Sequence, residues 1–193
     1  MINKIKLRID EIKNNFSQLY EYAGNDINLS ANEIINSIQL NSKIMFCGNG
    51  GSAADSQHLS AELLGRYRIN REALPAIALT TDTSTITAIG NDFSFSEIFS
   101  RQVSAIGKEG DVLYAISTSG NSENIIRAIE VAKIKKIKTI GLTGSSGGKL
   151  LNLCDILIKV PAERPDRVQE MHIAVGQIIC EIVESYFFGK KNS

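Results

Sequence analysis

The stretch Lys43-Ile-Met-Phe-Cys-Gly-Asn-Gly-Gly-Ser-Ala-Ala-Asp-Ser-Gln-His-Leu-Ser-Ala-Glu62 decides the fold. Its apolar run 44–47 is typical of a strand that is buried on both faces. The glycines that follow permit backbone angles closed to other residues and let a ligand approach the main chain. Ser52 is a favourable N-cap, so the stretch predicts a strand, a glycine loop and a helix in succession. The start of such a helix favours an anion.

Four more apolar segments alternate with helical patterns along the rest of the chain. The predicted strands are 74–79, 111–118, 138–143 and 155–160, and the predicted helices are 84–90, 96–106, 122–134 and 165–187. This alternation favours a parallel sheet with helices on both faces. The expected fold class is therefore α/β: a doubly wound, Rossmann-like five-stranded parallel sheet with N-terminal helices and a long C-terminal helix.

The N-terminal region carries a helical stripe. Apolar residues recur every three or four positions from Ile2 to Ala23, which predicts a helix that ends near Gly24, followed by a second helix over 27–41. The first helix either packs on its own domain or joins subunits. A heptad stripe ahead of a complete α/β unit favours assembly. We therefore expect a helical arm for oligomerisation at 1–41 and an α/β domain at 42–193 that forms one unit with the arm.

Net charge, cysteine content and the lengths of the apolar runs indicate which partners and which compartment to expect. The 193 residues hold 21 basic and 21 acidic side chains, so net charge gives no indication of a nucleic acid or membrane partner. Three widely spaced cysteines fit neither a disulfide framework nor a CxxC metal site, and they predict a reducing compartment. The N-terminus lacks the apolar core of a signal peptide, and no apolar run approaches about 18 residues. These features predict a cytoplasmic protein without a membrane segment.

The glycine loop imitates a dinucleotide-binding fingerprint. That fingerprint requires an acidic residue about 20 positions further on, whereas here the next predicted strand ends near Asp82, well beyond that distance. A Walker loop is excluded because no Gly-Lys-Ser/Thr follows the glycines. We therefore expect no nucleotide cofactor.

A second polar loop, Ser117-Thr-Ser-Gly-Asn-Ser122, lies between the predicted strand 111–118 and the helix 122–134. Four hydroxyl groups and the free N–H groups of a helix start are typical of a site for a phosphate monoester. The loop has no lysine, so neutral donors would carry the binding. Serine-rich loops also occur without a ligand. In an open parallel sheet this loop and the glycine loop both lie at carboxyl ends of strands, where ligands bind.

Two helical pairs are further candidates. His58 and Glu62 are four residues apart and share a helix face, where they could bind zinc or move protons at a carbon next to a carbonyl. The same spacing is common in ordinary helix pairs. Gln169 and His172 share one side of the last helix, and polar groups on a buried side need partners. A ligand, a metal or another helix could supply them.

Six motifs occur together in one order. They are Cys-Gly-Asn-Gly-Gly-Ser, Gln-His-x-x-x-Glu-Leu-x-Gly-Arg-Tyr, Gly-Asn-Asp-Phe, Phe-Ser-Arg, Ser-Thr-Ser-Gly-Asn-Ser and Arg-Val-Gln-Glu-Met-His. From about residue 40 to the C-terminus, this set resembles the phosphoheptose isomerases, a family of SIS (sugar isomerase) domain proteins. The resemblance implies a phosphosugar-binding SIS domain at 42–193 and a homotetramer. It also implies conversion of sedoheptulose 7-phosphate to D-glycero-D-manno-heptose 7-phosphate, for the heptose of lipopolysaccharide and other surface polysaccharides.

The resemblance also assigns residues by position. Glu62 is the implied proton-abstracting base. The implied substrate-binding residues are Asn49, Gly50, Gly51, Ser52, Glu62, Arg66, Asn91, Asp92, Asp166 and Gln169, with Ser117, Thr118, Ser119 and Ser122 at the phosphate. The implied zinc ligands are His58, Glu62, Gln169 and, at the fourth position, Gln177.

Gln177 departs from the family pattern. The isomerases that the chain resembles carry a histidine there, eight residues after Gln169, whereas glutamine does not titrate and its amide oxygen is a weaker zinc ligand. A sister branch, the DnaA-initiator-associating proteins, also lacks this histidine, but it lacks the glutamate at the position of Glu62 as well. The alternative function is therefore a non-catalytic SIS protein that binds a phosphosugar or a DnaA-type initiator.

Overall fold

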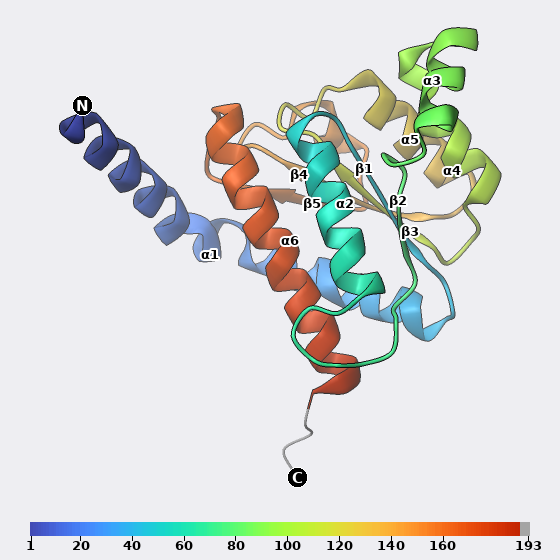
Figure 1. Cartoon of the computed structure of the whole chain (residues 1–193), viewed down its shortest axis with the longest axis horizontal. Helices are drawn as coiled ribbons and strands as arrows, with labels where there is room; N and C mark the ends of the chain where they lie inside the picture. Colours follow the sequence, from blue (N-terminus) through green and yellow to red (C-terminus); the bar gives the residue numbers. More distant parts are fainter. Residues whose placement is uncertain (190–193) are drawn as a thin grey trace.

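The computed structural model describes residues 1–189 and contains a five-stranded parallel sheet (Figure 1). Residues 190–193, the end of the predicted domain 42–193, lie outside the described residues. The strands are β1 (Ile44–Gly48), β2 (Ala76–Ala78), β3 (Val112–Ile116), β4 (Lys138–Thr143) and β5 (Ile156–Lys159). They lie in the order β2-β1-β3-β4-β5, so the chain winds outward in both directions from the middle. The predicted α/β class and doubly wound parallel sheet are confirmed.

Helices cover both faces of the sheet. One layer holds α1 (Ile2–Gln39), α2 (Gly51–Leu64) and α6 (Pro165–Phe188), and the other holds α3 (Thr83–Asp92), α4 (Ser100–Ile106) and α5 (Glu123–Ile134). Two 3-10 turns, η1 (Phe95–Glu97) and η2 (Gly148–Asn152), complete the elements. Phe46 and Tyr114 point into the first layer, whereas Met45 and Leu113 point into the second. Burial of both faces explains why the strands are continuous apolar runs.

The N-terminal region forms one helix, not two. The predicted break near Gly24 is wrong, because α1 runs without interruption from Ile2 to Gln39. Gly24 lies against the ring of Tyr20, and its neighbours Ala23 and Ile27 are buried in the core. A glycine inside a helix costs about 1 kcal/mol relative to alanine, and burial of an isoleucine contributes about 1.5–3 kcal/mol. The helix therefore continues past Gly24 because packing of its neighbours stabilises it more than the glycine destabilises it.

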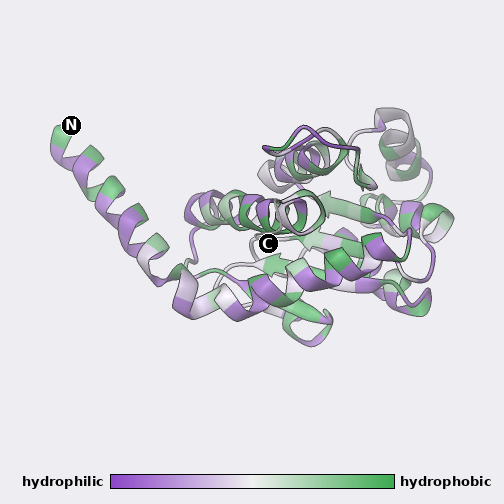
Figure 2. Cartoon of the chain, turned by 90° about the horizontal axis from the view of Figure 1, so that it is seen from below, coloured by the Kyte–Doolittle hydropathy of each residue, from purple (hydrophilic) through white to green (hydrophobic). Residues whose placement is uncertain are grey.

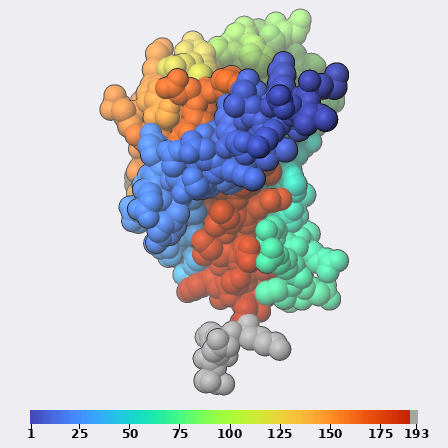
Figure 3. Space-filling view, turned by 90° about the vertical axis from the view of Figure 1, so that its left-hand side faces the viewer, coloured from blue at the N-terminus to red at the C-terminus, as the bar shows by residue number. Residues whose placement is uncertain are grey.

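The two halves of α1 have different surroundings. Its C-terminal half lies on the domain and buries Ala31, Ile34 and Ile38, and Figure 3 shows it crossing α6. Its N-terminal half extends away from the domain and displays hydrophobic residues along its length (Figure 2). Ile5 and Ile9 there are 55% and 47% exposed. In the single chain the predicted apolar stripe is thus largely unpaired.

Three further element bounds differ from the sequence prediction. The second strand is only Ala76–Ala78, preceded by Pro75, which has no N–H to donate to the sheet. The helix predicted over 96–106 is divided into η1 and α4. At the junction, the Ser100 hydroxyl donates a hydrogen bond to the Glu97 carbonyl oxygen at 3.1 Å. Local hydroxyl bonds of this kind compete with helix continuation. Asn91 and Asp92 form the last turn of α3 instead of a connecting turn.

Helix α6 is long and apolar enough, by length and composition, to cross a membrane. Its surroundings are those of a core helix: it packs against α1 and α2 and buries Val168, Met171, Val175 and Val183. A buried carboxylate, Glu184, also lies in its last turns. In this structure α6 is therefore a helix of the domain core.

Candidate active site

The glycine loop and the hydroxyl loop meet at the carboxyl edge of the sheet. Strands β1 and β3 are neighbours, with Gly48 beside Ile116 at their ends. Just beyond them, Asn49 and Asn124 exchange two side-chain hydrogen bonds, each 2.9 Å long. Asn124 is 3% exposed and belongs to the first turn of α5. This amide pair joins the loop after β1 to the start of the helix after β3.

The glycine loop leads directly into α2. Gly50 is the N-cap of α2 and has a φ of 56°, in the left-handed region that glycine adopts without strain. The predicted N-cap role of Ser52 is therefore wrong, since Ser52 lies in the first turn and is buried. A Cβ on Gly51 would approach the Gln169 side-chain amide to 2.8 Å. Gly51 thus makes room for Gln169, which reaches this loop from α6.

The hydroxyl loop, residues 117–122, lies at the start of α5. Ser122 is the N-cap of α5, and its hydroxyl lies 3.0 Å from the buried Ser117 hydroxyl. Ser119 is exposed, and its Oγ accepts a hydrogen bond of 3.1 Å from the Asn121 N–H. Gly120 has a φ of 65°, and a Cβ there would approach the Gly147 carbonyl oxygen to 2.1 Å. The loop is therefore held against the turn after β4, with its hydroxyls at the start of α5.

The predicted pair on α2 is present. His58 Nε2 and Glu62 Oε1 are 2.9 Å apart, and their side chains are 49% and 18% exposed. The Glu62 carboxylate is among the charges that raise the pKa of the Cys180 thiol on α6, after burial itself. A half-buried carboxylate beside an imidazole can accept and return a proton.

His58 and Glu62 are distant from the start of α2. Glu62 follows Gly51 by eleven residues, which corresponds to roughly 16 Å along the helix axis. Gln169 lies at the Gly51 end, and Gln177 lies two turns further along α6. Within one chain, the structure therefore brings Gln169 to the glycine loop and places Glu62 further along α2, away from that loop.

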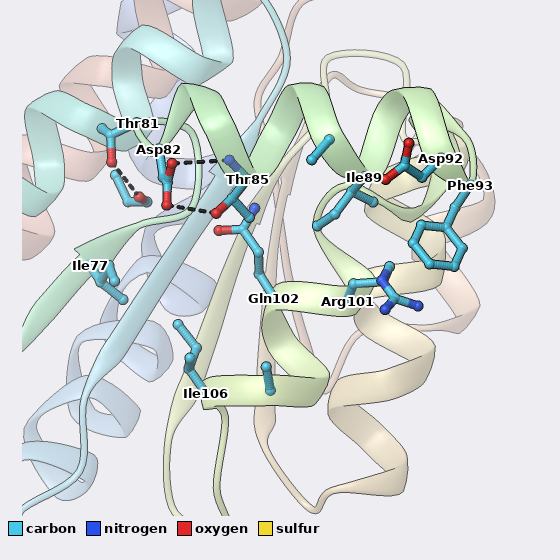
Figure 4. A pocket seen from close by; sticks show the side chains of 13 residues that line it. Ile77, Thr81, Asp82, Thr85, Ile89, Asp92, Phe93, Arg101, Gln102 and Ile106 are labelled. Carbon is cyan, nitrogen blue, oxygen red and sulfur yellow. Dashed lines mark hydrogen bonds between the residues drawn. The ribbon is translucent and has the colours of Figure 1, made fainter.

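Asn91 and Asp92 lie at the end of α3, exposed, and the Asn91 amide donates to the Asp92 carboxylate at 2.8 Å. Asp92 lines a pocket of about 500 Å³ between α3, α4 and β2 (Figure 4). In this pocket the Arg101 guanidinium lies 3.8 Å from the centre of the Phe93 ring. The pocket is mainly apolar and distinct from the hydroxyl loop, so among the described contacts these two residues do not join that loop.

Three predicted site residues remain: Thr118, Arg66 and Asp166. Thr118 is half-buried in the hydroxyl loop, and Arg66 is exposed just beyond α2. Asp166 forms ion pairs with Arg164 at 2.5 Å and with Arg167 at 3.1 Å. The hydrogen bond from Arg164 is the main cause that holds the pKa of Asp166 well below its usual range. Asp166 is therefore an ionised and fully paired carboxylate in the single chain.

The donors present do not match an ordinary zinc site. Zinc is bound by thiolates, imidazoles and carboxylates, whereas two of the four predicted ligands, Gln169 and Gln177, are amides. Within residues 1–189, no three His, Cys, Asp or Glu side chains converge as a metal site. The second histidine, His172, is fully buried in the core, and burial lowers its pKa to about 4. Of the four predicted ligands, His58 and Glu62 are thus the two that are typical zinc donors.

Sequence reasoning missed two residues of this region. Asn124 could have been suspected because it follows the hydroxyl loop within the first turn of a helix, but its partner is 75 positions away. Asp55 lies on α2 three and seven residues before His58 and Glu62, and therefore on their face. Burial raises the pKa of Asp55 to about 6, with the His58 charge as an opposing influence.

Comparison with known proteins identifies the family. A family model described as "SIS domain" matches residues 9–144. The phosphoheptose isomerase of Akkermansia muciniphila is 48% identical over 189 residues, 98% of this chain and 100% of the relative. That of Rhodospirillum rubrum is 57% identical over 155 residues, 80% of this chain and 82% of the relative.

A solved structure gives the same result. The phosphoheptose isomerase from Francisella tularensis superposes with a TM-score of 0.92 at 37% identity, covering 95% of this chain and 98% of the other. These matches favour the isomerases over the DnaA-associating alternative. The chain belongs to the SIS domain family and, within it, to the phosphoheptose isomerases.

Proposed function

We propose that the protein isomerises sedoheptulose 7-phosphate to D-glycero-D-manno-heptose 7-phosphate. The observation that carries this proposal is the Glu62 carboxylate, 18% exposed and 2.9 Å from His58, in a chain that closely resembles named phosphoheptose isomerases. The hydroxyl loop supports it further, because Ser117 and Ser122 lie at the start of α5, where a phosphate is favoured.

The chemistry is an enediol isomerisation. The hydroxyl loop anchors the phosphate of the open-chain ketose. Glu62 removes a proton from carbon 1, next to the carbonyl at carbon 2, and the electron pair of the broken C–H bond forms the enediol. The proton then returns to carbon 2, while the hydroxyl proton on the carbon 1 oxygen moves to the carbon 2 oxygen. The carbonyl now lies at carbon 1, as in the aldose, and the reaction neither gains nor loses electrons overall. Neutral donors near the reacting oxygens stabilise the enediolate, which preorganised dipoles do effectively.

We further propose a homotetramer in which a second copy completes the site. Glu62 lies roughly 16 Å along α2 from Gly51 within one chain. In the proposed assembly, Glu62 of one copy and the loops of another serve one substrate. The apolar N-terminal half of α1, with Ile5 and Ile9 exposed, supports assembly through helices.

The cellular setting stays a prediction. The expected location is the cytoplasm, and the expected product feeds the heptose of lipopolysaccharide or other surface polysaccharides. Zinc also stays a prediction from the family resemblance, and the reaction steps above do not depend on it. The free cysteines Cys47, Cys154 and Cys180 are compatible with a reducing compartment.

The purified protein tests the proposal when it is incubated with sedoheptulose 7-phosphate and the aldose product is measured. Wild-type turnover is the expected result. Ribulose 5-phosphate, a ketose phosphate with a shorter carbon chain, is the control substrate. The assay is run with added zinc and with a chelator. A protein that binds sedoheptulose 7-phosphate but never converts it, in either condition, would contradict the proposed isomerase function.

A further inference from the structure

The loop between α2 and β2, residues 65–75, is fastened to α6 by a buried ion pair. Arg71 Nε donates to Glu184 Oε1 at 2.9 Å, and the two side chains are only 1% and 3% exposed. In Figure 1 this loop passes the C-terminal part of α6, beside the end of α2. Buried charges need complete pairing, and both members of this pair have it.

Glu184 binds the loop main chain. Its two carboxylate oxygens accept hydrogen bonds from three consecutive N–H groups, those of Tyr67 at 2.8 Å, Arg68 at 2.7 Å and Ile69 at 2.9 Å. Burial raises the pKa of Glu184, but these donors and Arg71 outweigh it and lower the pKa below its usual value. An ionised carboxylate on α6 therefore fixes the backbone that directly follows Arg66.

Arg71 binds the end of α2. Its Nη2 donates to the Glu62 carbonyl oxygen at 2.8 Å, and its Nη1 donates to the Leu63 carbonyl oxygen at 2.8 Å. The last carbonyl groups of a helix lack intrahelical partners, and a cation near them also complements the helix dipole. Arg71 thus caps α2 at the very residue that carries the proposed base.

We propose that Arg71 and Glu184 are positioning residues for Glu62. They hold the last turn of α2 against α6, and so set the direction of the Glu62 carboxylate and the place of Arg66. The inference rests on the proposed function, since it concerns the same base. It predicts that loosening this pair affects the chemical step more than the capture of the phosphate, because the hydroxyl loop lies at the other end of α2.

The chain offers a matched control. Arg68 and Glu181 join the same loop to the same helix at 2.9 Å, but their side chains are 67% and 45% exposed. Exposed pairs of this kind contribute about 0–1 kcal/mol. Glu181→Gln therefore changes the charge of α6 by the same amount as Glu184→Gln without touching the Glu62 end of α2.

The experiment compares Glu184→Gln, Arg71→Lys and Glu181→Gln. For the two buried-pair variants kcat should fall by about tenfold to a hundredfold, as expected for a misplaced catalytic group, with the dissociation constant for the sugar phosphate within a few-fold of wild type. Glu181→Gln should keep wild-type kcat. Arg71→Lys retains the buried charge balance but loses the planar guanidinium. If Glu184→Gln lowers the fraction of folded protein, the comparison of kcat uses Arg71→Lys instead.

Amide hydrogen exchange adds a readout without turnover. Exchange at Tyr67, Arg68 and Ile69 should be faster in Glu184→Gln than in Glu181→Gln. Unchanged exchange there, or an active wild type whose buried-pair variants keep wild-type kcat, overturns this inference and leaves the proposed function standing. A wild type without turnover rejects the proposed function and this inference with it.

Discussion

Asn49 and Asn124 are joined by two reciprocal amide hydrogen bonds, each 2.9 Å long, across the carboxyl ends of β1 and β3. The pair links the loop that opens α2 to the first turn of α5. It fixes the separation of two loops that sequence analysis had assigned to the same ligand. Because Asn124 is buried, its amide cannot exchange this partner for water without a change in the loops.

Asn124→Ala should therefore weaken sugar-phosphate binding. The substitution leaves the Asn49 amide without its partner and releases the start of α5, at a cost of about 1–3 kcal/mol. We expect the dissociation constant, measured by calorimetry, to rise by roughly fivefold or more. Glu130→Gln, on the exposed side of the same helix, is the control. Equal affinities for wild type and Asn124→Ala would show that the two loops act independently.

Gln177→His should raise zinc affinity. The substitution adds an imidazole on α6, which packs against the helix that carries Glu62, and imidazole is a better zinc ligand than an amide oxygen. We expect tighter binding on the order of tenfold or more, since even outer partners of a metal site change affinity by that factor. Competition with a chromogenic chelator measures it. Identical zinc affinities for the two proteins would place residue 177 away from any zinc site.

The N-terminal half of α1 should drive assembly. Ile9 and Phe16 are 47% and 37% exposed in the single chain, so Ile9→Asp with Phe16→Asp should spare the fold and introduce charges only into an interface. Light scattering should show a tetramer for wild type and a smaller species for the double variant. Ile134→Asp, at an 82% exposed site on α5, is the control. A wild type that is monomeric at micromolar concentration contradicts the prediction.

Stability should depend on pH through His172 and Asp55 with opposite signs. Burial lowers the pKa of His172 to about 4, so its contribution is present above the unfolded pKa of about 6.5 and is lost as pH falls towards 4. Burial raises the pKa of Asp55 to about 6, so the folded protein binds that proton first and gains stability as pH falls from 6 towards 4.

Single variants separate these two effects. Between pH 7 and pH 5, His172→Gln should lose less free energy of unfolding than wild type, and Asp55→Asn should lose more. Urea denaturation at both pH values measures the difference. The comparison uses only the pH-dependent change, since each substitution also alters packing. If His172→Gln changes with pH as wild type does, His172 is not the buried neutral group described here.

Local patterns allowed much of this architecture to be predicted. The apolar runs identified all five strands, because strands buried on both faces must be apolar. The four-residue spacing of His58 and Glu62 predicted their contact, which depends only on helix geometry. The hydroxyl loop and a helix that begins near residue 122 were also predicted, and α5 begins at Glu123 with Ser122 as its N-cap.

What escaped prediction depends on tertiary contacts. The sequence predicted a helix end at Gly24, but burial of Ile27 outweighs the low helix propensity of glycine. The contact of Arg71 with Glu184 spans 113 positions, and no local pattern marks it. The separation of Glu62 from Gln169 likewise follows from how α2 and α6 pack, since Gln169 lies at the Gly51 end of α2.

The central claim is that Glu62 is the base of a sugar-phosphate isomerisation, and the kcat of Glu62→Gln with sedoheptulose 7-phosphate tests it most directly. The amide has nearly the same shape but cannot accept the proton from carbon. We predict that kcat falls by roughly 10²- to 10⁴-fold relative to an active wild type, with the dissociation constant for the substrate within a few-fold. Undiminished kcat in Glu62→Gln would contradict the account.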